Sequence, residues 1–223
     1  MKWWPFKQNQ GDKTPFVKEF LSKGKIGIPG VRAINQLEFT VLDTETTGLN
    51  PQQDYILSFG AVKVTKQVLQ VATAVEWYPE SPLVGDKTAA IHGLVDRKNI
   101  IKPKIFAQQL LEYVGQSIIV GHHIGFDLEM LLKITKGSGL RSFPNPILDT
   151  MNLAIRLDYG PHVGHVHIRY EEYSLDSLCV RYNIPVEDRH TAAGDAFLTA
   201  QLLLKLLKVA TAKGVQTYGQ LIR

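Results

Sequence analysis

The sequence predicts an α/β protein built on a sheet of mixed strand direction. Three apolar stretches come first, LEFTVLD (37–43), YILSFGAVKV (55–64) and VLQVATAVEWY (68–78), and only TKQ separates the last two. A link this short favours consecutive antiparallel strands. Strand-like and helix-like segments then alternate, which is the pattern of an α/β fold rather than of an all-β one.

The later segments are expected to supply two more strands and the covering helices. PKIFAQQLLEYVG has apolar residues at helical spacing, and the short apolar run SIIVG that follows is interpreted as a strand. The remaining segments, in chain order, are the helix-like FDLEMLLKITKG (126–137), the strand-to-helix segment NPILDTMNLAIRL (145–157), the helix SLDSLCVRYNI (174–184) and the long final helix TAAGDAFLTAQLLLKLLKVA (191–210).

The first 35 residues differ from the rest in charge and aromatic content. They hold seven Lys/Arg against two Asp/Glu, whereas the whole chain carries a formal charge of +4. Within them, TPFVKEFLSKG predicts a short helix with Thr14 as N-cap and Pro15 at its first position. We therefore expect residues 1–35 to be a basic, aromatic extension that packs on the body or on a partner. A solvated tail and a phosphate-contacting arm are the alternatives for its charge.

Composition also bears on compartment. No run approaches the roughly 18 apolar residues that span a bilayer, and MKWWPFKQNQ lacks the apolar stretch of a secretory signal. We expect a cytoplasmic protein with no membrane partner. The single cysteine, Cys179, is interpreted as a packing residue of a helix.

The stretch VLDTETTGL (41–49) places two carboxylates at the end of an apolar strand. Residues two apart in a strand project to the same side, so Asp43 and Glu45 can face one site. Two close carboxylates repel unless a cation neutralises them, and hard oxygen ligands suit Mg²⁺ or Mn²⁺. The alternative is an ordinary strand end that reaches solvent.

Three further polar residues stand at predicted element ends. Asp127 follows the strand-like SIIVG, and RHTAAGDAF sets His190 five residues before Asp195 at the entry to the last helix. Each has a structural explanation, since Asp127 can cap a helix and His190 can be a surface loop residue. Together with Asp43 and Glu45 they favour a metal-dependent catalytic site.

These motifs resemble those of a known family. VLDTETTGL, VGHHIGFDLEML (120–131) and RHTAAGDA (189–196) resemble, in order, the three motifs of the DnaQ-like (DEDDh) 3′→5′ exonucleases, which include the proofreading epsilon subunit of bacterial DNA polymerase III. AAIHGL (89–94) resembles the family's substrate-contacting loop, and ILDTMNLA (147–154) a recurrent strand-to-helix segment. The resemblance implies a ribonuclease H-like mixed five-stranded sheet flanked by helices, with residues 36–223 as the exonuclease domain.

The resemblance also implies roles for individual residues. Four acids would bind two divalent metal ions, Mg²⁺ or Mn²⁺, and His190 would be the general base. The tyrosine branch of the family places its base four residues before the last acid, where this chain has Thr191, so the histidine branch is indicated. The implied metal ligands are Asp43, Glu45, Asp127 and Asp195, and the implied substrate contacts are Thr46, His92, Leu94 and Phe126.

Two departures from the family pattern stand out. His123 occupies the position where the family usually has asparagine. The stretch DYGPHVGHVHIRYEEY (158–173) is rich in histidine, and its residues His162, His165 and His167 are either transition-metal ligands or, as we expect, part of an ordinary exposed loop.

The expected function is a two-metal 3′→5′ exonuclease that hydrolyses single-stranded nucleic acid, with DNA favoured, to nucleoside 5′-monophosphates. Its partners would be nucleic-acid 3′ ends and, if it proofreads, a DNA polymerase subunit. The alternatives are a non-catalytic nucleic-acid-binding subunit, an RNA-trimming exoribonuclease of the same family and a ribonuclease H-type endonuclease.

Overall fold

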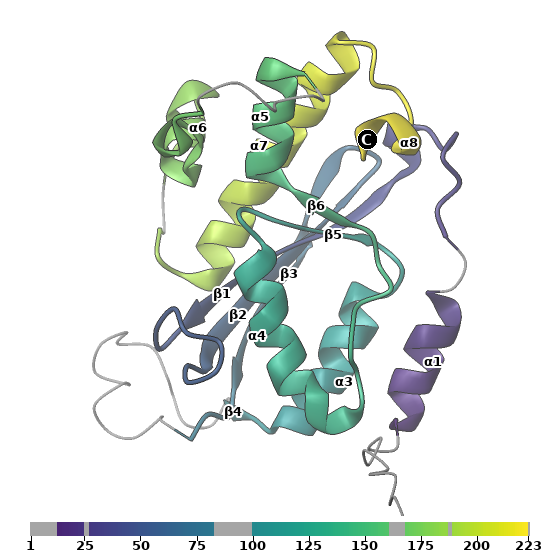
Figure 1. The fold of residues 1–223 in the computed structure, drawn as a ribbon, viewed down its shortest axis with the longest axis vertical. Helices are drawn as coiled ribbons and strands as arrows, with labels where there is room; N and C mark the ends of the chain where they lie inside the picture. Colours follow the sequence, from purple (N-terminus) through teal and green to yellow (C-terminus); the bar gives the residue numbers. More distant parts are fainter. Residues whose placement is uncertain (1–12, 25–26, 83–99, 161–167, 187–188, 223) are drawn as a thin grey trace, which may run out of the picture.

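The computed structural model describes residues 13–24, 27–82, 100–160, 168–186 and 189–222. Its centre is a six-stranded mixed sheet in the order β4-β3-β2-β1-β5-β6 (Figure 1). The strands are β1 (Glu38–Thr46), β2 (Ile56–Thr65), β3 (Val68–Pro79), β4 (Ile100–Ile101), β5 (Ile118–Gly121) and β6 (Ile147–Asp149). The helices are α1 (Pro15–Lys23), α3 (Pro103–Val114), α4 (Gly125–Thr135), α5 (Thr150–Tyr159), α6 (Leu175–Arg181), α7 (Ala192–Ala212) and α8 (Tyr218–Leu221).

Strand direction changes at β1. On one side β1, β2 and β3 form the predicted antiparallel meander, and on the other side β5 and β6 run parallel to β1. The predicted α/β class and mixed sheet are confirmed, but the predicted number of five strands is wrong. The sixth strand, β4, is two residues long and pairs with Tyr78 and Pro79 at the sheet edge. Two residues are too few to show the alternation by which a strand is recognised in a sequence.

Helices cover both faces of the sheet, and β1 contributes to both layers. Phe39 and Val41 belong to the core that packs under α5, α6 and α7, whereas Leu42 belongs to the core under α1, α3 and α4. Figure 1 shows these two groups of helices toward the top and the bottom of the view. Since side chains alternate along a strand, Asp43 and Glu45 continue the row of Phe39 and Val41 toward α7.

The described part of the N-terminal extension packs on the body. Thr14 and Pro15 take the predicted N-cap and first-turn positions of α1. The backbone nitrogen and Oγ1 of Thr14 both donate to the carbonyl of Ser138, at 3.0 and 3.1 Å. Val17 and Phe20 are buried in the core under α1, α3 and α4. The boundary between an extension and residues 36–223 stays a prediction.

Two smaller expectations concern the helices. Cys179 is fully buried in α6 and packs in the core, as predicted. Within the residues that the structure describes, no helix combines the length and the apolar character that crossing a membrane requires.

Candidate active site

Three carboxylates meet at the end of β1. Asp43 and Glu45 from β1 and Asp195 from the first turn of α7 each offer an oxygen, and these oxygens all lie within 4.8 Å of one another. The two-residue repeat of the strand sets the first pair, and α7 brings the third. Asp195 is buried, whereas Asp43 and Glu45 are half-buried. The predicted convergence of these three acids is therefore present in the fold.

A glycine makes the approach of α7 possible. Gly60 in β2 pairs with Asp43 in the β1–β2 register. A Cβ at Gly60 would lie 2.1 Å from the carbonyl carbon of Ala192 and 2.3 Å from the nitrogen of Ala193. Only glycine lets the first turn of α7 lie this close to the strand. Sequence reasoning missed this contact, although a glycine inside an apolar strand is the signal that marks such an approach.

Asp127 reaches the site from the other layer. It lies in the first turn of α4, is 7% exposed, and its Oδ1 accepts hydrogen bonds from the nitrogen and Oγ1 of Thr44 at 2.9 and 2.6 Å. Thr44 stands between Asp43 and Glu45 on β1. Asp127 is not one of the three acids that converge within 4.8 Å, but it is fixed to the strand that carries two of them.

The acids are held together at an electrostatic cost. Burial raises the pKa of Asp43 well above its ordinary value, and the charges of Asp127, Asp195 and Glu45 raise it further, while Arg189 opposes them. Burial also raises the pKa of Asp127 to about 6, against the hydrogen bonds from Thr44. Buried like charges of this kind favour a bound cation, which would restore the ionised forms.

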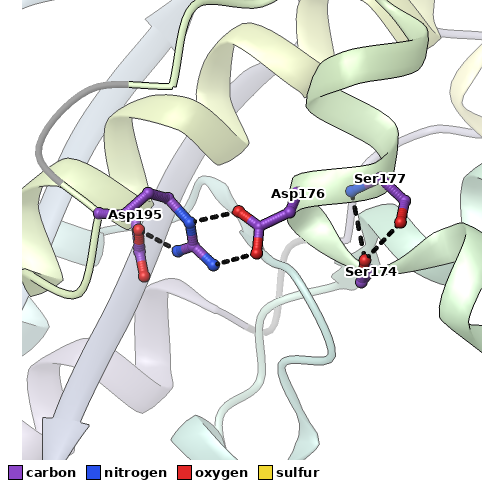
Figure 2. Close-up of polar contacts among 5 residues, drawn as sticks. Ser174, Asp176, Ser177 and Asp195 are labelled. Carbon is purple, nitrogen blue, oxygen red and sulfur yellow. Dashed lines mark hydrogen bonds and ion pairs between the residues drawn. The ribbon is translucent and has the colours of Figure 1, made fainter.

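One cation from the chain itself lies beside this cluster, and sequence reasoning missed it. The guanidinium of Arg189 forms an ion pair with Asp195 on one side and bonds both carboxylate oxygens of Asp176, in α6, on the other (Figure 2). Arg189 and Asp176 are thirteen residues apart, so no local pattern in the sequence indicates their contact.

His190 follows Arg189 directly. Its side chain is exposed and its backbone has a φ of 63°, in the left-handed region. The next residue, Thr191, is the N-cap of α7, and its Oγ1 accepts from the nitrogen of Gly194 at 3.0 Å. The predicted position of His190 at the entry to the last helix is confirmed, whereas its role as a base stays a prediction.

Of the four residues predicted to contact substrate, the structure describes Thr46 and Phe126. Thr46 ends β1, half-buried, with its Oγ1 donating to the carbonyl of Gly48 at 2.8 Å. Phe126 in α4 packs in part against the core. His92 and Leu94 lie outside the described residues, as do His162, His165 and His167. Their predicted roles are not tested.

The two histidines after β5 have different surroundings. The Nδ1 of His122 lies 3.0 Å from Oγ1 of Thr150, and burial lowers the pKa of this imidazole. His123 is exposed with a φ of 59°. A left-handed backbone is tolerated by histidine as well as by asparagine, which accounts for His123 at the position where the family pattern has asparagine.

A helix-covered mixed sheet with carboxylates gathered at the end of its central strand defines the class of ribonuclease H-like α/β proteins. The particular family follows from the sequence, since the model of a family described as exonuclease (RNase_T) matches residues 40–203. The chain belongs to this exonuclease family, and the resemblance to the DnaQ-like exonucleases is confirmed.

Individual relatives agree with this assignment. The chain is 32% identical over 92% of its length to a DNA polymerase III subunit epsilon-like protein of Rhodobacter capsulatus, of which it spans 28%. It is 27% identical over 83% of its length to the DNA polymerase III subunit epsilon of Aquifex aeolicus, covering 88% of that protein. Among solved structures, E. coli exonuclease I in complex with a dT13 oligonucleotide matches 80% of this chain and 43% of the other, with a TM-score of 0.61 and 18% identity.

Proposed function

We propose that this chain is a metal-dependent 3′→5′ exonuclease of the DEDDh type that hydrolyses single-stranded DNA. The observation that carries the proposal is the convergence of the Asp43, Glu45 and Asp195 oxygens within 4.8 Å. Asp127 is bonded to the same strand, and His190 lies at the entry to α7. Membership of an exonuclease family supports the reaction class.

The donor set fits divalent cations. All four acids offer hard oxygen ligands, and burial together with mutual repulsion raises the pKa of Asp43. We therefore assign Asp43, Glu45, Asp127 and Asp195 as the residues that would hold Mg²⁺ or Mn²⁺. When bound, two such ions would supply activation of a water molecule and stabilisation of the leaving oxygen.

The chain's own residues perform the remaining steps. His190 accepts a proton from the attacking water through its imidazole, the side chain that most often serves as a general base. The water oxygen forms a bond to phosphorus as the bond to the 3′-oxygen breaks, and the leaving 3′-oxygen takes a proton from solvent. The products are a nucleoside 5′-monophosphate and a strand shortened by one residue with a new 3′-hydroxyl. Thr46 and Phe126, with His92 and Leu94, are the proposed contacts of the terminal nucleotides.

The substrate and partner are proposed from the relatives. Two similar proteins are named as DNA polymerase III subunits or subunit-like proteins, and exonuclease I was solved with an oligonucleotide. These names favour DNA over RNA and favour a polymerase as a partner of this chain. The expected cytoplasmic location stays a prediction.

The proposal is tested with 5′-labelled single-stranded DNA and RNA of equal sequence, incubated with Mg²⁺, with Mn²⁺ or with EDTA. We expect a ladder that shortens from the 3′ end, requires the metal and is faster on DNA. Asp43→Asn should abolish the ladder because it removes a charged ligand. Glu129→Gln, which changes an exposed acid of α4, is the matched control and should keep full activity.

The alternatives have different products. Internal fragments would indicate an endonuclease, and faster shortening of RNA would indicate an exoribonuclease. Binding of the oligonucleotides without any cleavage under either metal would overturn the catalytic assignment in favour of a non-catalytic binding subunit.

A further inference from the structure

Arg189 is held by three contacts that come from two separate helices, α6 and α7. Its Nε bonds Asp176 Oδ1 at 2.7 Å, its Nη2 bonds Asp176 Oδ2 at 3.2 Å, and its Nη1 pairs with Asp195 (Figure 2). The Arg189 side chain is only 19% exposed. A guanidinium bonded in this way by a carboxylate has a defined orientation as well as a charge.

Asp176 is itself held in a fixed place. It lies in the first turn of α6, where Ser174 is the N-cap. The Oγ of Ser174 accepts from the nitrogen of Ser177 at 3.2 Å and lies 2.8 Å from Ser177 Oγ (Figure 2). A capped first turn is less prone to fray than an uncapped one. The contact with Arg189 is therefore made from the capped first turn of α6.

The segment between Arg189 and α7 is short and carries His190. Thr191 is the N-cap of α7, and its carbonyl accepts from the nitrogen of Asp195 at 2.9 Å. His190 lies between these two anchors, with a left-handed backbone and an exposed side chain. Histidine adopts a left-handed backbone more readily than most residues other than glycine. The bonds of Arg189 on one side and of Thr191 on the other fix the ends of the segment that carries His190.

We propose that Arg189, clamped by Asp176, is a positioning residue of the exonuclease reaction that sets both the Asp195 carboxylate and the His190 backbone. The inference rests on the proposed function. It assigns no contact with substrate to Arg189 and requires no change in its protonation. A small misplacement of reacting groups costs up to roughly 100-fold in rate, so the effect falls on turnover.

The ordinary alternative is a surface ion pair. The Asp176 side chain is 60% exposed, and exposed pairs contribute little to stability. That alternative predicts that breaking the pair changes neither turnover nor the ordering of His190. A positioning role predicts that breaking the pair causes a large loss of turnover with little change in the midpoint of unfolding.

The test measures kcat and KM of the full chain on a single-stranded DNA oligonucleotide with Mn²⁺. Asp176→Asn is nearly isosteric, and the side-chain hydrogen bonds described for Asp176 all go to Arg189. We expect this variant to lower kcat roughly 10-fold or more with KM within about twofold. Arg189→Met should lower kcat further. Arg189→Lys should behave like Arg189→Met, because an ammonium cannot bond both oxygens of Asp176 in the same plane. The double variant should be no slower than Arg189→Met alone, because the pair acts as a unit.

The matched control is Arg181→Met. Arg181 belongs to α6, as Asp176 does, and forms an ion pair with an aspartate, Asp158, at 2.9 Å. It should keep the wild-type kcat. A second readout does not need turnover: amide hydrogen exchange of residues 189–195 should be faster in Asp176→Asn and unchanged in Arg181→Met.

The outcomes separate this inference from the proposed function. Wild-type protein that makes no 3′ ladder overturns both. Active wild-type protein with an equally active Asp176→Asn overturns the positioning role alone. Full activity in Arg189→Lys would also overturn the positioning role, because Arg189 would then act only through its charge. An equal loss of activity in Arg181→Met would overturn it too, because it would indicate general damage to α6.

Discussion

Replacing Asp127 by asparagine should stabilise the protein in the absence of divalent cations. Asp127 is 7% exposed, and burial raises the pKa of its carboxyl from 3.8 to about 6. Between these two pH values the unfolded chain loses a proton that the folded chain keeps, so the free energy of unfolding falls as pH rises. Above about pH 6 the full cost is present, and a difference of this size corresponds to roughly 3 kcal/mol.

The asparagine variant removes this cost with little change in shape. Its side-chain oxygen can still accept the hydrogen bonds from the nitrogen and Oγ1 of Thr44. With EDTA present, urea unfolding should show Asp127→Asn gaining up to roughly 3 kcal/mol over wild type at pH 8 and nothing below pH 3.8. Added Mn²⁺ should stabilise the wild type and do so far less in the variant.

Glu129→Gln provides the reference for this experiment, because Glu129 is an exposed acid on the same helix. It should unfold like wild type at both pH values. An Asp127→Asn variant that is no more stable than wild type at pH 8, or that gains equally at low pH, would refute the electrostatic reasoning.

Two further changes test the geometry of the site. His190→Ala should lower kcat roughly 10²–10⁴-fold, the usual contribution of a general base, while calorimetric titration shows Mn²⁺ affinity largely kept; normal turnover would remove His190 from the mechanism. Gly60→Ala should destabilise the fold by about 1–3 kcal/mol through overpacking and should nearly abolish activity, because the added Cβ would lie 2.1 Å from Ala192 and displace the turn that carries Asp195. Gly137→Ala, where a Cβ meets nothing within 4 Å, is its control in the same unfolding and ladder assays, and equal behaviour of the two variants would contradict the close-approach argument.

The sequence was most informative where function depends on local periodicity. Asp43 and Glu45 could be assigned to one side of a strand because the two-residue repeat operates over a short stretch. The place of Asp195 in the first turn of the last helix could be predicted for a similar reason, because apolar spacing marks the start of α7. These local rules explain why the strands of the meander, and the places of Asp43, Glu45 and Asp195 at the ends of elements, were predicted correctly.

Contacts between distant segments were not predictable in the same way. Two contacts depend on how separate elements pack, which no local spacing encodes. They are the ion pair of Asp176 with Arg189 and the close approach of α7 to Gly60. The edge strand β4 was missed because it is only two residues long. The separate place of Asp127, fixed to Thr44 rather than among the three converging oxygens, likewise depends on the opposite layer of helices.

The bond between Thr44 and Asp127 has a consequence for the sheet itself. Parallel pairing of β1 with β5 covers Phe39–Val41 and stops before the acids. Beyond that point a side chain takes the place of a neighbouring strand, since the carboxylate of Asp127 accepts the backbone hydrogen of Thr44. The end of the ladder is thus closed by a group that also belongs to the site. The protection of the Thr44 backbone amide from solvent exchange, measured by nuclear magnetic resonance, would therefore report on binding at this site.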